Sequence, residues 1–206
     1  MIKLYLQQSR PFSTIEAGLQ ELPHHLQRRI LKRKQKRKQW SSLQGYLLLK
    51  HALQEEFNTS INDLVFLESG KPILKNQTIA FNISHCKELL GVALCKEGRI
   101  GLDIEAFRKF DDVTTAFSFF SPKEQAVILK AADPNWKLIE FWSKKEALVK
   151  AVGGQMFDMA GYTDVTSEST VWLGKTYFFH RTNNDFNGFI WVCSSFRVPN
   201  VNVCWL

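Results

Sequence analysis

Two acidic side chains at alternate positions of an apolar segment are the first residues that could do chemistry. Asp103 and Glu105 lie in the stretch IGLDIEAF, residues 100–107. In a strand both carboxylates would project from one face, with backbones roughly 6.6 Å apart, close enough to bind one hard cation. Gly101 precedes them on the same face, where we expect it to leave room for a bulky ligand. The same pattern is also typical of a solvated strand face, because carboxylates are mostly exposed.

A third carboxylate, Glu146, lies in the segment NWKLIEFWSKKEALVKAV, residues 135–152. Apolar residues recur through this segment, which predicts one continuous helix ending at the glycines that follow. Glu146 and Lys150 would then lie one turn apart on one helix face. On its own, such a pair is most simply a surface ion pair worth a few tenths of a kcal/mol.

Four further polar residues are candidate phosphate donors. Lys71 lies at the tip of a Gly-Lys-Pro turn, and Ser84 and His85 end the predicted strand AFNIS. Each has an ordinary interpretation as a solvated lysine or a polar strand end. Together with Lys150 they could bind phosphate groups, provided that the fold brings them to one place.

Positive charge is concentrated in one run. The chain has a formal charge of +7, but residues 28–38, RRILKRKQKRK, hold eight basic side chains, and removing these eight charges leaves −1. The run indicates an anionic partner, which could be nucleic acid, a membrane surface, an acidic protein or a phosphorylated small molecule. No aromatic residue interrupts the run and no recognition module surrounds it, which makes nucleic acid the weaker choice.

Composition limits the class of protein. A chain of 206 residues that is 45% hydrophobic can bury a core as one domain or two small ones. The four cysteines have neither a CxxC spacing nor a zinc pattern, so we expect reduced thiols. No stretch approaches the roughly 18 to 20 apolar residues of a membrane span, and the first residues do not form a signal peptide. We therefore expect a cytoplasmic protein without a membrane segment.

The predicted elements alternate between short strands and helices. We expect a strand at residues 2–6 and an amphipathic helix at 41–57, which the basic run begins or precedes. Four short strand segments follow between residues 63 and 105, and their tight connections favour an antiparallel meander. In that meander the strands carrying Ser84 and Asp103 would each pair with the strand between them. A helix capped by Ser121 and the Glu146 helix come next, and the chain is β-rich after residue 154.

In order, the motifs SGKP, FNISHC, IGLDIE, FFSPKE and FWSKKEALVKAVGGQM resemble those of the 4′-phosphopantetheinyl transferases. The resemblance is to the larger monomeric type that activates peptide and polyketide synthetases. This family combines a D-x-E strand with a helix segment [FW]-[SC]-x-K-E-[AS]-x-x-K some forty residues later. Here 40 residues separate Glu105 from Glu146. The motifs span residues 69–156.

The resemblance implies transfer of the phosphopantetheine arm of coenzyme A to a serine of an acidic apo carrier protein, with release of adenosine 3′,5′-bisphosphate. At the matching positions Asp103, Glu105 and Glu146 would bind Mg2+, with Mn2+ as a substitute. Glu146 would also be the general base, and Lys150 would contact the diphosphate. The implied coenzyme A contacts are Lys71, Pro72, Ser84, His85, Lys150 and Ser42.

The implied fold is α+β, a monomer of two pseudo-twofold-related halves with coenzyme A between them. We expect residues 1–100 to form the coenzyme A and carrier side, and residues 101–206 to form the half with the metal-binding strand and the catalytic helix. Ser41 stands where many relatives have an arginine that holds the nucleotide. The basic run could replace that arginine or attract the acidic carrier. Two other classes stay open from the residues alone: a basic nucleic-acid-binding module with structural carboxylates, and a metal-dependent phosphohydrolase.

Overall fold

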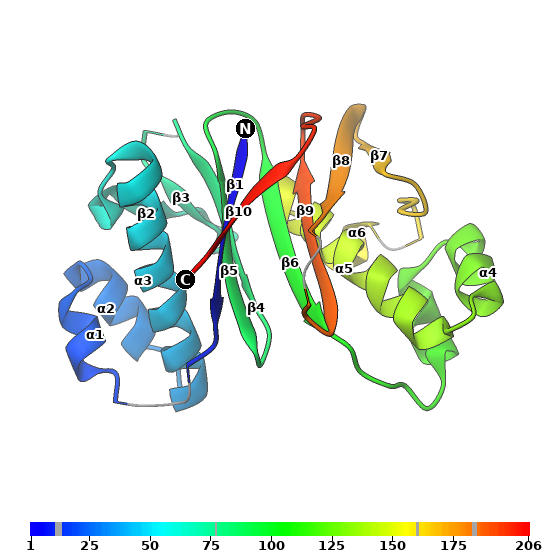
Figure 1. Ribbon diagram of the computed structural model, residues 1–206, viewed down its shortest axis with the longest axis horizontal. Helices are drawn as coiled ribbons and strands as arrows, with labels where there is room; N and C mark the ends of the chain where they lie inside the picture. The colour runs from blue at the N-terminus through cyan, green and yellow to red at the C-terminus, as the bar shows by residue number, and fades with distance from the viewer. Residues whose placement is uncertain (11–13, 77, 160, 183–184) are drawn as a thin grey trace.

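The chain folds into two halves, each built from a long helix packed on a four-stranded sheet (Figure 1). The computed structural model describes residues 1–206 except 11–13, 77, 160 and 183–184. The elements of the first half are β1 (Ile2–Gln8), α1 (Glu16–Gln20), α2 (His24–Leu31), α3 (Lys36–Phe57), η1 (Ile61–Asp63), β2 (Leu64–Phe66), β3 (Pro72–Leu74), β4 (Ala80–His85) and β5 (Leu89–Cys95). Those of the second are β6 (Ile100–Ala106), η2 (Val113–Phe119), α4 (Pro122–Lys130), α5 (Pro134–Val152), α6 (Met156–Met159), β7 (Ser169–Trp172), β8 (Lys175–Arg181) and β9 (Gly188–Ser194), and β10 (Val201–Trp205) ends the chain.

The strand order assigns the last strand to the first half. One sheet runs β10-β1-β5-β4 and the other β6-β9-β8-β7, while β2 and β3 form a separate hairpin. β10 returns to pair in parallel with β1, with Ile2 opposite Val201 (Figure 1). The predicted α+β class of two halves is confirmed. The structure adds that residues 201–205, which the sequence-based division placed in the second half, complete the sheet of the first.

The predicted meander is wrong at its last step. β4 pairs with β5 as expected, but β6 pairs with β9 rather than with β5. β4 and β6 are instead the edge strands of two different sheets, joined by side chains. The backbone N–H of Leu102 donates to Asn82 Oδ1 at 3.0 Å, and that of Ile104 donates to Ser84 Oγ at 3.2 Å. The expected proximity of Ser84 and Asp103 is therefore confirmed, but through side chains that satisfy an exposed strand edge.

β6 does not pair beside β5 because its apolar face packs face to face on the first sheet. Ile100, Leu102 and Ile104 belong to a buried cluster with residues of β1 and β5. Gly91 of β5 allows this approach, because a Cβ there would lie 2.8 Å from Ile104 Cδ1. A strand paired beside β5 could not cover that surface. The molecule thus has a core between the two sheets, besides one under the helices of each half.

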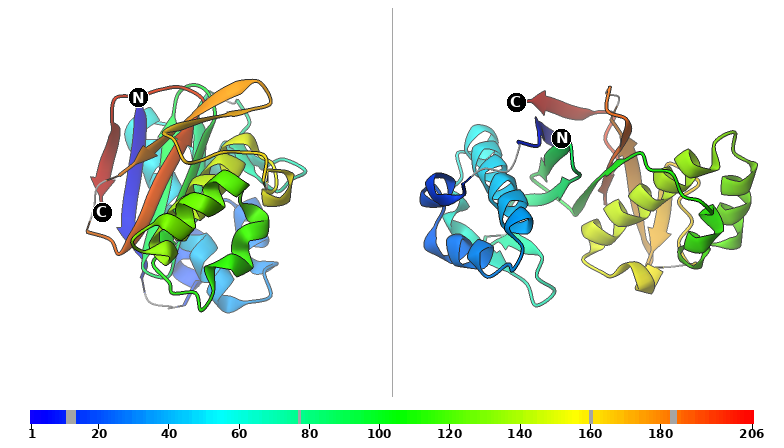
Figure 2. Two further views of the ribbon diagram at one scale, coloured as in Figure 1. Left: turned by 90° about the vertical axis from the view of Figure 1, so that its right-hand side faces the viewer. Right: turned by 90° about the horizontal axis from the view of Figure 1, so that it is seen from below.

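The helices differ from prediction mainly at the basic run. The second part of the run begins α3 at Lys36, which the expectation allowed, but the first part belongs to α2, which was not predicted. Figure 2 shows α1 to α3 on the outer side of the first half, whereas in the second half α5 lies against the sheet and α4 lies farther out. Ser121 caps α4 in a capping box, as predicted. α5 is continuous through Glu146 and ends at Gly153, whose φ is +80°.

The four cysteines carry free thiols. Of the helices in the described ranges, none is both long and apolar enough to cross a membrane.

Candidate functional site

Asp103 is the centre of a hydrogen-bonded cluster where β4, β6 and α5 meet. Asp103 is only 4% exposed. Ser143 Oγ of α5 donates to Asp103 Oδ2 at 2.8 Å, and Lys150 Nζ lies 2.6 Å from Oδ1. Ser84 Oγ of β4 donates to the same Oδ1 at 3.4 Å. Three elements from both halves therefore converge on one carboxylate.

Lys150 joins that cluster from the last turns of α5. Its ammonium donates to Ser84 Oγ at 3.0 Å as well as to Asp103. The Ser84 hydroxyl thus contacts Asp103, Lys150 and the Ile104 amide together. Such charge-assisted hydrogen bonds are among the stronger ones in proteins. Lys150, Ser84 and Asp103 are brought together as the sequence predicted.

The other two carboxylates lie within electrostatic range of Asp103. Burial, and then the charge of Asp103, raise the pKa of the Glu105 carboxyl. Burial also raises the pKa of Glu146, as do Asp103 and Glu105, although Lys150 acts in the opposite direction. Glu105 is ion-paired with Arg108 at 2.7 Å. The three predicted metal ligands are therefore near one another and mutually unfavourable as anions.

These carboxylates are not arranged as a ready-made metal cage. In the part of the chain that the structure describes, no three or more Asp, Glu, His or Cys side chains converge closely enough to hold a metal ion. Asp103 holds the Lys150 ammonium instead. Asp103 therefore accepts a cation, and three neighbouring carboxylates match the oxygen preference of Mg2+. The metal assignment stays a prediction.

Lys71 lies in the site region but contacts the end of α5. Its ammonium donates to the backbone carbonyls of Lys150 and Ala151, the latter at 3.3 Å. Arg99 donates to the next carbonyl, that of Val152, at 3.2 Å. A cation is favourable here because helix-terminal carbonyls lack helical partners. Burial, and next the charge of Arg99, lower the pKa of Lys71 to about 8.

His85 lies at the edge of the cluster next to the basic run. Partial burial of its ring, followed by the charges of Lys150, Arg33 and Arg37, lowers the pKa of the imidazole. Arg33 and Arg37 are therefore close enough to act on His85, one at the loop after α2 and the other in α3. The structure thus brings two cations of the basic run close to His85, one of the implied coenzyme A contacts.

Not all of the basic run is available to a ligand. Arg29 donates to the Gly70 carbonyl at 3.2 Å and its guanidinium lies 3.7 Å from the centre of the Phe66 ring. These contacts hold α2 against the β2–β3 hairpin, next to the turn that carries Lys71. This arginine therefore has a structural role that the charge pattern did not reveal.

The remaining two predicted contacts are less engaged with the cluster. The Ser42 hydroxyl donates to the Lys38 carbonyl one turn earlier in α3, at 2.8 Å. Pro72 begins β3 and is partly exposed. No contact of either with the carboxylate cluster is seen among the described residues, so their role in binding coenzyme A stays a prediction.

The expectation for Gly101 is wrong. A Cβ at this position would lie 2.0 Å from the Ala147 carbonyl oxygen and 2.5 Å from the Ala151 amide nitrogen. The glycine therefore makes room for the backbone of α5, not for a ligand. This close approach is what brings α5, with Ser143 and Lys150, against the Asp103 face of β6.

Sequence reasoning missed several residues that position the site. Asn82 accepts from a backbone amide of β6, and Ser143 donates to Asp103. Arg108 pairs with Glu105. Lys145, next to Glu146, is fully buried in an ion pair with Glu124 at 3.0 Å. The only available signal was that polar residues recur inside otherwise apolar segments, which does not reveal their partners.

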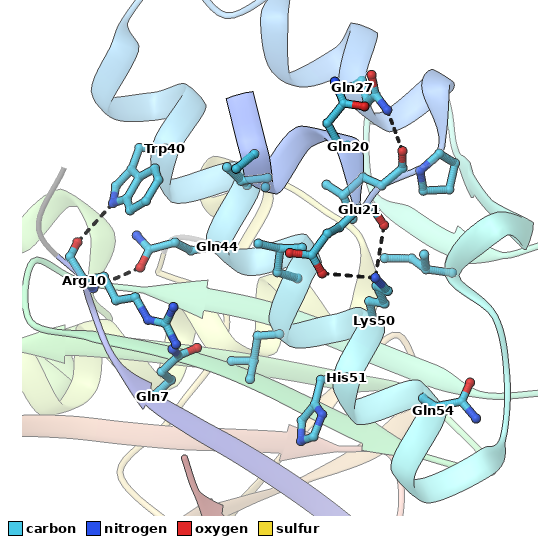
Figure 3. A pocket seen from close by; sticks show the side chains of 18 of the residues that line it. Gln7, Arg10, Gln20, Glu21, Gln27, Trp40, Gln44, Lys50, His51 and Gln54 are labelled. Carbon is cyan, nitrogen blue, oxygen red and sulfur yellow. Dashed lines mark hydrogen bonds and ion pairs between the residues drawn. The ribbon is translucent and has the colours of Figure 1, made fainter. Parts of the chain in front are cut away.

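A large groove lies away from this cluster, in the first half. It measures about 1480 Å3 and lies between the end of β1 and helices α1 to α3 (Figure 3). Gln44 Oε1 accepts from the Arg10 backbone amide, and Glu21 pairs with Lys50 across it. None of the site residues predicted from the sequence lines the groove.

Two family models match the chain, one in each half. The model for the 4′-phosphopantetheinyl transferase superfamily matches residues 99–196. The model described as 4′-phosphopantetheinyl transferase, N-terminal, matches residues 10–97. The two models together match most of the chain, and the relatives described next agree with them: the chain belongs to the 4′-phosphopantetheinyl transferase family.

Curated relatives agree. The 4′-phosphopantetheinyl transferase AcpT of Salmonella typhi is 34% identical over 152 residues, which cover 71% of this chain and 73% of the relative. AcpT of Escherichia coli strain K12 is 31% identical over 141 residues, 66% and 68% of the two chains. The transferase gsp of Aneurinibacillus migulanus is 31% identical over 122 residues, 57% of this chain and 50% of the relative. Phosphopantetheine transfer is thus the general reaction of this enzyme.

Proposed function

We propose that this protein transfers the 4′-phosphopantetheine moiety of coenzyme A to a serine of an apo acyl or peptidyl carrier protein, with Mg2+. The main support for this proposal is that Asp103, Glu105 and Glu146 lie within electrostatic range of one another, beside Lys150. Such a group of anions suits a divalent cation, and that cation together with Lys150 would suit a diphosphate. Family membership supports the reaction class, and the proximity of these residues supports the roles proposed for them.

The residues would divide the work as follows. Asp103, Glu105 and Glu146 would hold Mg2+, which neutralises phosphate charge and stabilises the leaving group when it is bound. Lys150 reaches the same place and would contact the diphosphate. His85 would contact the 3′-phosphate of coenzyme A, and Arg33 and Arg37 close to it offer positive charge for that phosphate.

The chemical step transfers one phosphoryl group. The carrier serine Oγ forms a bond to the phosphorus that bears the pantetheine arm, and the bond from that phosphorus to the bridging diphosphate oxygen breaks. Adenosine 3′,5′-bisphosphate leaves with the electron pair, and the serine proton passes to Glu146. Burial and neighbouring carboxylates raise the pKa of Glu146, and a base with a pKa nearer neutrality is more effective at physiological pH.

The carrier is proposed to be acidic. The basic side chains of residues 32–38 are exposed, in the loop before α3 and in its first turn, and two of them, Arg33 and Arg37, are close enough to act on His85. Positive charge beside a site accelerates encounter with a negatively charged partner. Arg29 of the run contacts Gly70 and Phe66 within the protein, so its charge does not require an external partner.

The direct test is a mass shift on purified apo carriers of fatty-acid, polyketide and peptide synthesis, incubated with coenzyme A and Mg2+. We expect covalent addition of phosphopantetheine, lost in Glu146→Gln by about 100-fold or more and retained in Lys137→Met. Lys137 is a suitable control because it is ion-paired with Glu140 at the far end of the same helix. No modification of any carrier by folded wild-type protein would overturn the proposal.

A further inference from the structure

Two of the three predicted metal ligands are ion-paired with cationic side chains of the protein itself. Lys150 Nζ lies 2.6 Å from Asp103 Oδ1, and Arg108 lies 2.7 Å from Glu105 Oε2. The other oxygen of Asp103 accepts from Ser143 at 2.8 Å. Two of the three carboxylates are therefore ion-paired without any metal, and Asp103 has both oxygens engaged.

The two ion pairs differ in burial, which decides which one matters. Asp103 is 5% and Lys150 29% exposed in their side chains, whereas Arg108 is 48% exposed. An exposed pair exchanges easily with water and contributes little. A buried carboxylate strongly prefers to keep a partner, because an unpaired buried charge is costly. Lys150 is thus the cation that any metal must displace from Asp103.

A second feature holds the ammonium in this place. Lys150 Nζ also donates to Ser84 Oγ at 3.0 Å, and that hydroxyl is fixed by the Ile104 amide at 3.2 Å. The amide belongs to β6, so the same strand that carries Asp103 orients the serine. Lys150 therefore has a preorganised resting position, made of Asp103 and Ser84, on the carboxylate side of the site.

We infer that Lys150 competes with the divalent metal for Asp103, so that the protein binds metal weakly until the diphosphate of coenzyme A draws the ammonium away. This rests on the proposed function, which names the two ligands. A metal on Asp103 and an ammonium in the same position repel each other, while an anionic diphosphate attracts both. By linkage, metal and coenzyme A each strengthen the binding of the other.

The test measures Mn2+ affinity by electron paramagnetic resonance, without carrier and without turnover. Wild-type protein should bind Mn2+ at least about tenfold more weakly alone than with coenzyme A, within the usual range of coupling. Lys150→Met should tighten Mn2+ binding in the absence of coenzyme A by about tenfold, and Lys150→Arg, which keeps the charge, should not. Lys137→Met makes the same charge change on the same helix and should leave the affinity within about twofold.

Direct chelation by the diphosphate would also couple the two ligands, so the decisive comparison is the one made without coenzyme A. Equal Mn2+ affinity of wild type and Lys150→Met under that condition would overturn the competition. Equal tightening in Lys137→Met would show a general charge effect instead, and would overturn it too. Circular dichroism checks that each variant is folded.

These outcomes are separable from those of the proposed function. Carrier modification together with unchanged Mn2+ affinity in Lys150→Met would remove only the competition. Tightened Mn2+ binding without modification of any carrier would support the competition and remove only the transfer reaction.

Discussion

At the scale of single residues, the site is formed by groups that destabilise the protein before a ligand arrives. Glu105 and Glu146 both have a raised pKa, caused first by burial and then by neighbouring carboxylates. A carboxyl whose pKa is higher in the folded than in the unfolded protein lowers the stability of the folded protein once it ionises. Such strain is expected where binding or catalysis requires like charges side by side.

Glu146→Gln should therefore stabilise the metal-free protein while it removes activity. The unfolded carboxyl ionises near pH 4.3, so the wild-type free energy of unfolding should fall relative to that of the variant as pH rises through this value. We expect no difference well below that pH and about 0.5–2 kcal/mol in favour of Glu146→Gln at pH 7. Urea denaturation in the presence of a chelator measures it.

Glu55→Gln, at an exposed position of α3, is the control and should show little difference at any pH. A variant of Glu146 that is equally or less stable than wild type at pH 7 would contradict the assignment of this strain.

At the scale of elements, a buried ion pair fixes α5 against α4. Lys145 and Glu124 are 3.0 Å apart with side chains 0% exposed, and Lys145 also donates to the Thr163 carbonyl at 2.8 Å. Glu124 accepts from the backbone amides of Ser121 and Val165 at 2.7 and 2.9 Å. Every polar atom of the pair has a partner, which a buried pair requires.

Lys145→Met should lower the free energy of unfolding by about 3–5 kcal/mol, because it leaves the Glu124 carboxylate buried without its cation. Adding Glu124→Gln should recover part of the loss, since an amide carries no charge. Lys123→Met is the matched control: its bridge to Asp164 is exposed, and it should cost less than about 1 kcal/mol. Denaturant titrations compare the four proteins, and a double variant no more stable than Lys145→Met would refute the charge argument.

At the scale of the whole molecule, the two halves meet where two sheet edges approach each other. β4 and β6 do not form a ladder, and the Leu102 amide is satisfied by Asn82 Oδ1, from a residue 8% exposed. The apolar face of β6 packs on the first sheet at the same place. Orientation of the halves, and with it the distance from Ser84 to Asp103, depends on these few contacts.

Asn82→Ala should destabilise the protein by about 1–3 kcal/mol, because the buried Leu102 amide loses its acceptor. In this variant, hydrogen exchange should show that the Leu102 amide exchanges faster than amides inside either sheet. Asn202→Ala, on the exposed side of β10, should change stability by less than about 0.5 kcal/mol. Unchanged protection of Leu102 in Asn82→Ala would mean that another group or water satisfies it.

Local pattern was enough to identify most elements and the group of candidate residues. The alternation of IGLDIEAF gave the correct faces of β6, and the capping residues gave the start of α4 and the end of α5. Asp103, Lys150 and Ser84 could be selected from residue type and spacing because side-chain direction follows backbone period. The sequence did not reveal where within the basic run one helix ends and the next begins, or which of its side chains make contacts inside the protein. Propensity is a weak guide among long polar residues.

What the sequence by itself determined was thus most of the strands and longer helices, the face on which the carboxylates lie, and the resemblance to the family. Only the tertiary structure decided that β6 pairs with β9, that β10 returns to β1, that Gly101 admits α5, and that Lys71 and Lys150 bind within the protein. The reason is that periodicity encodes which side of an element is apolar, whereas the partner of that side is chosen by packing between segments far apart in the chain.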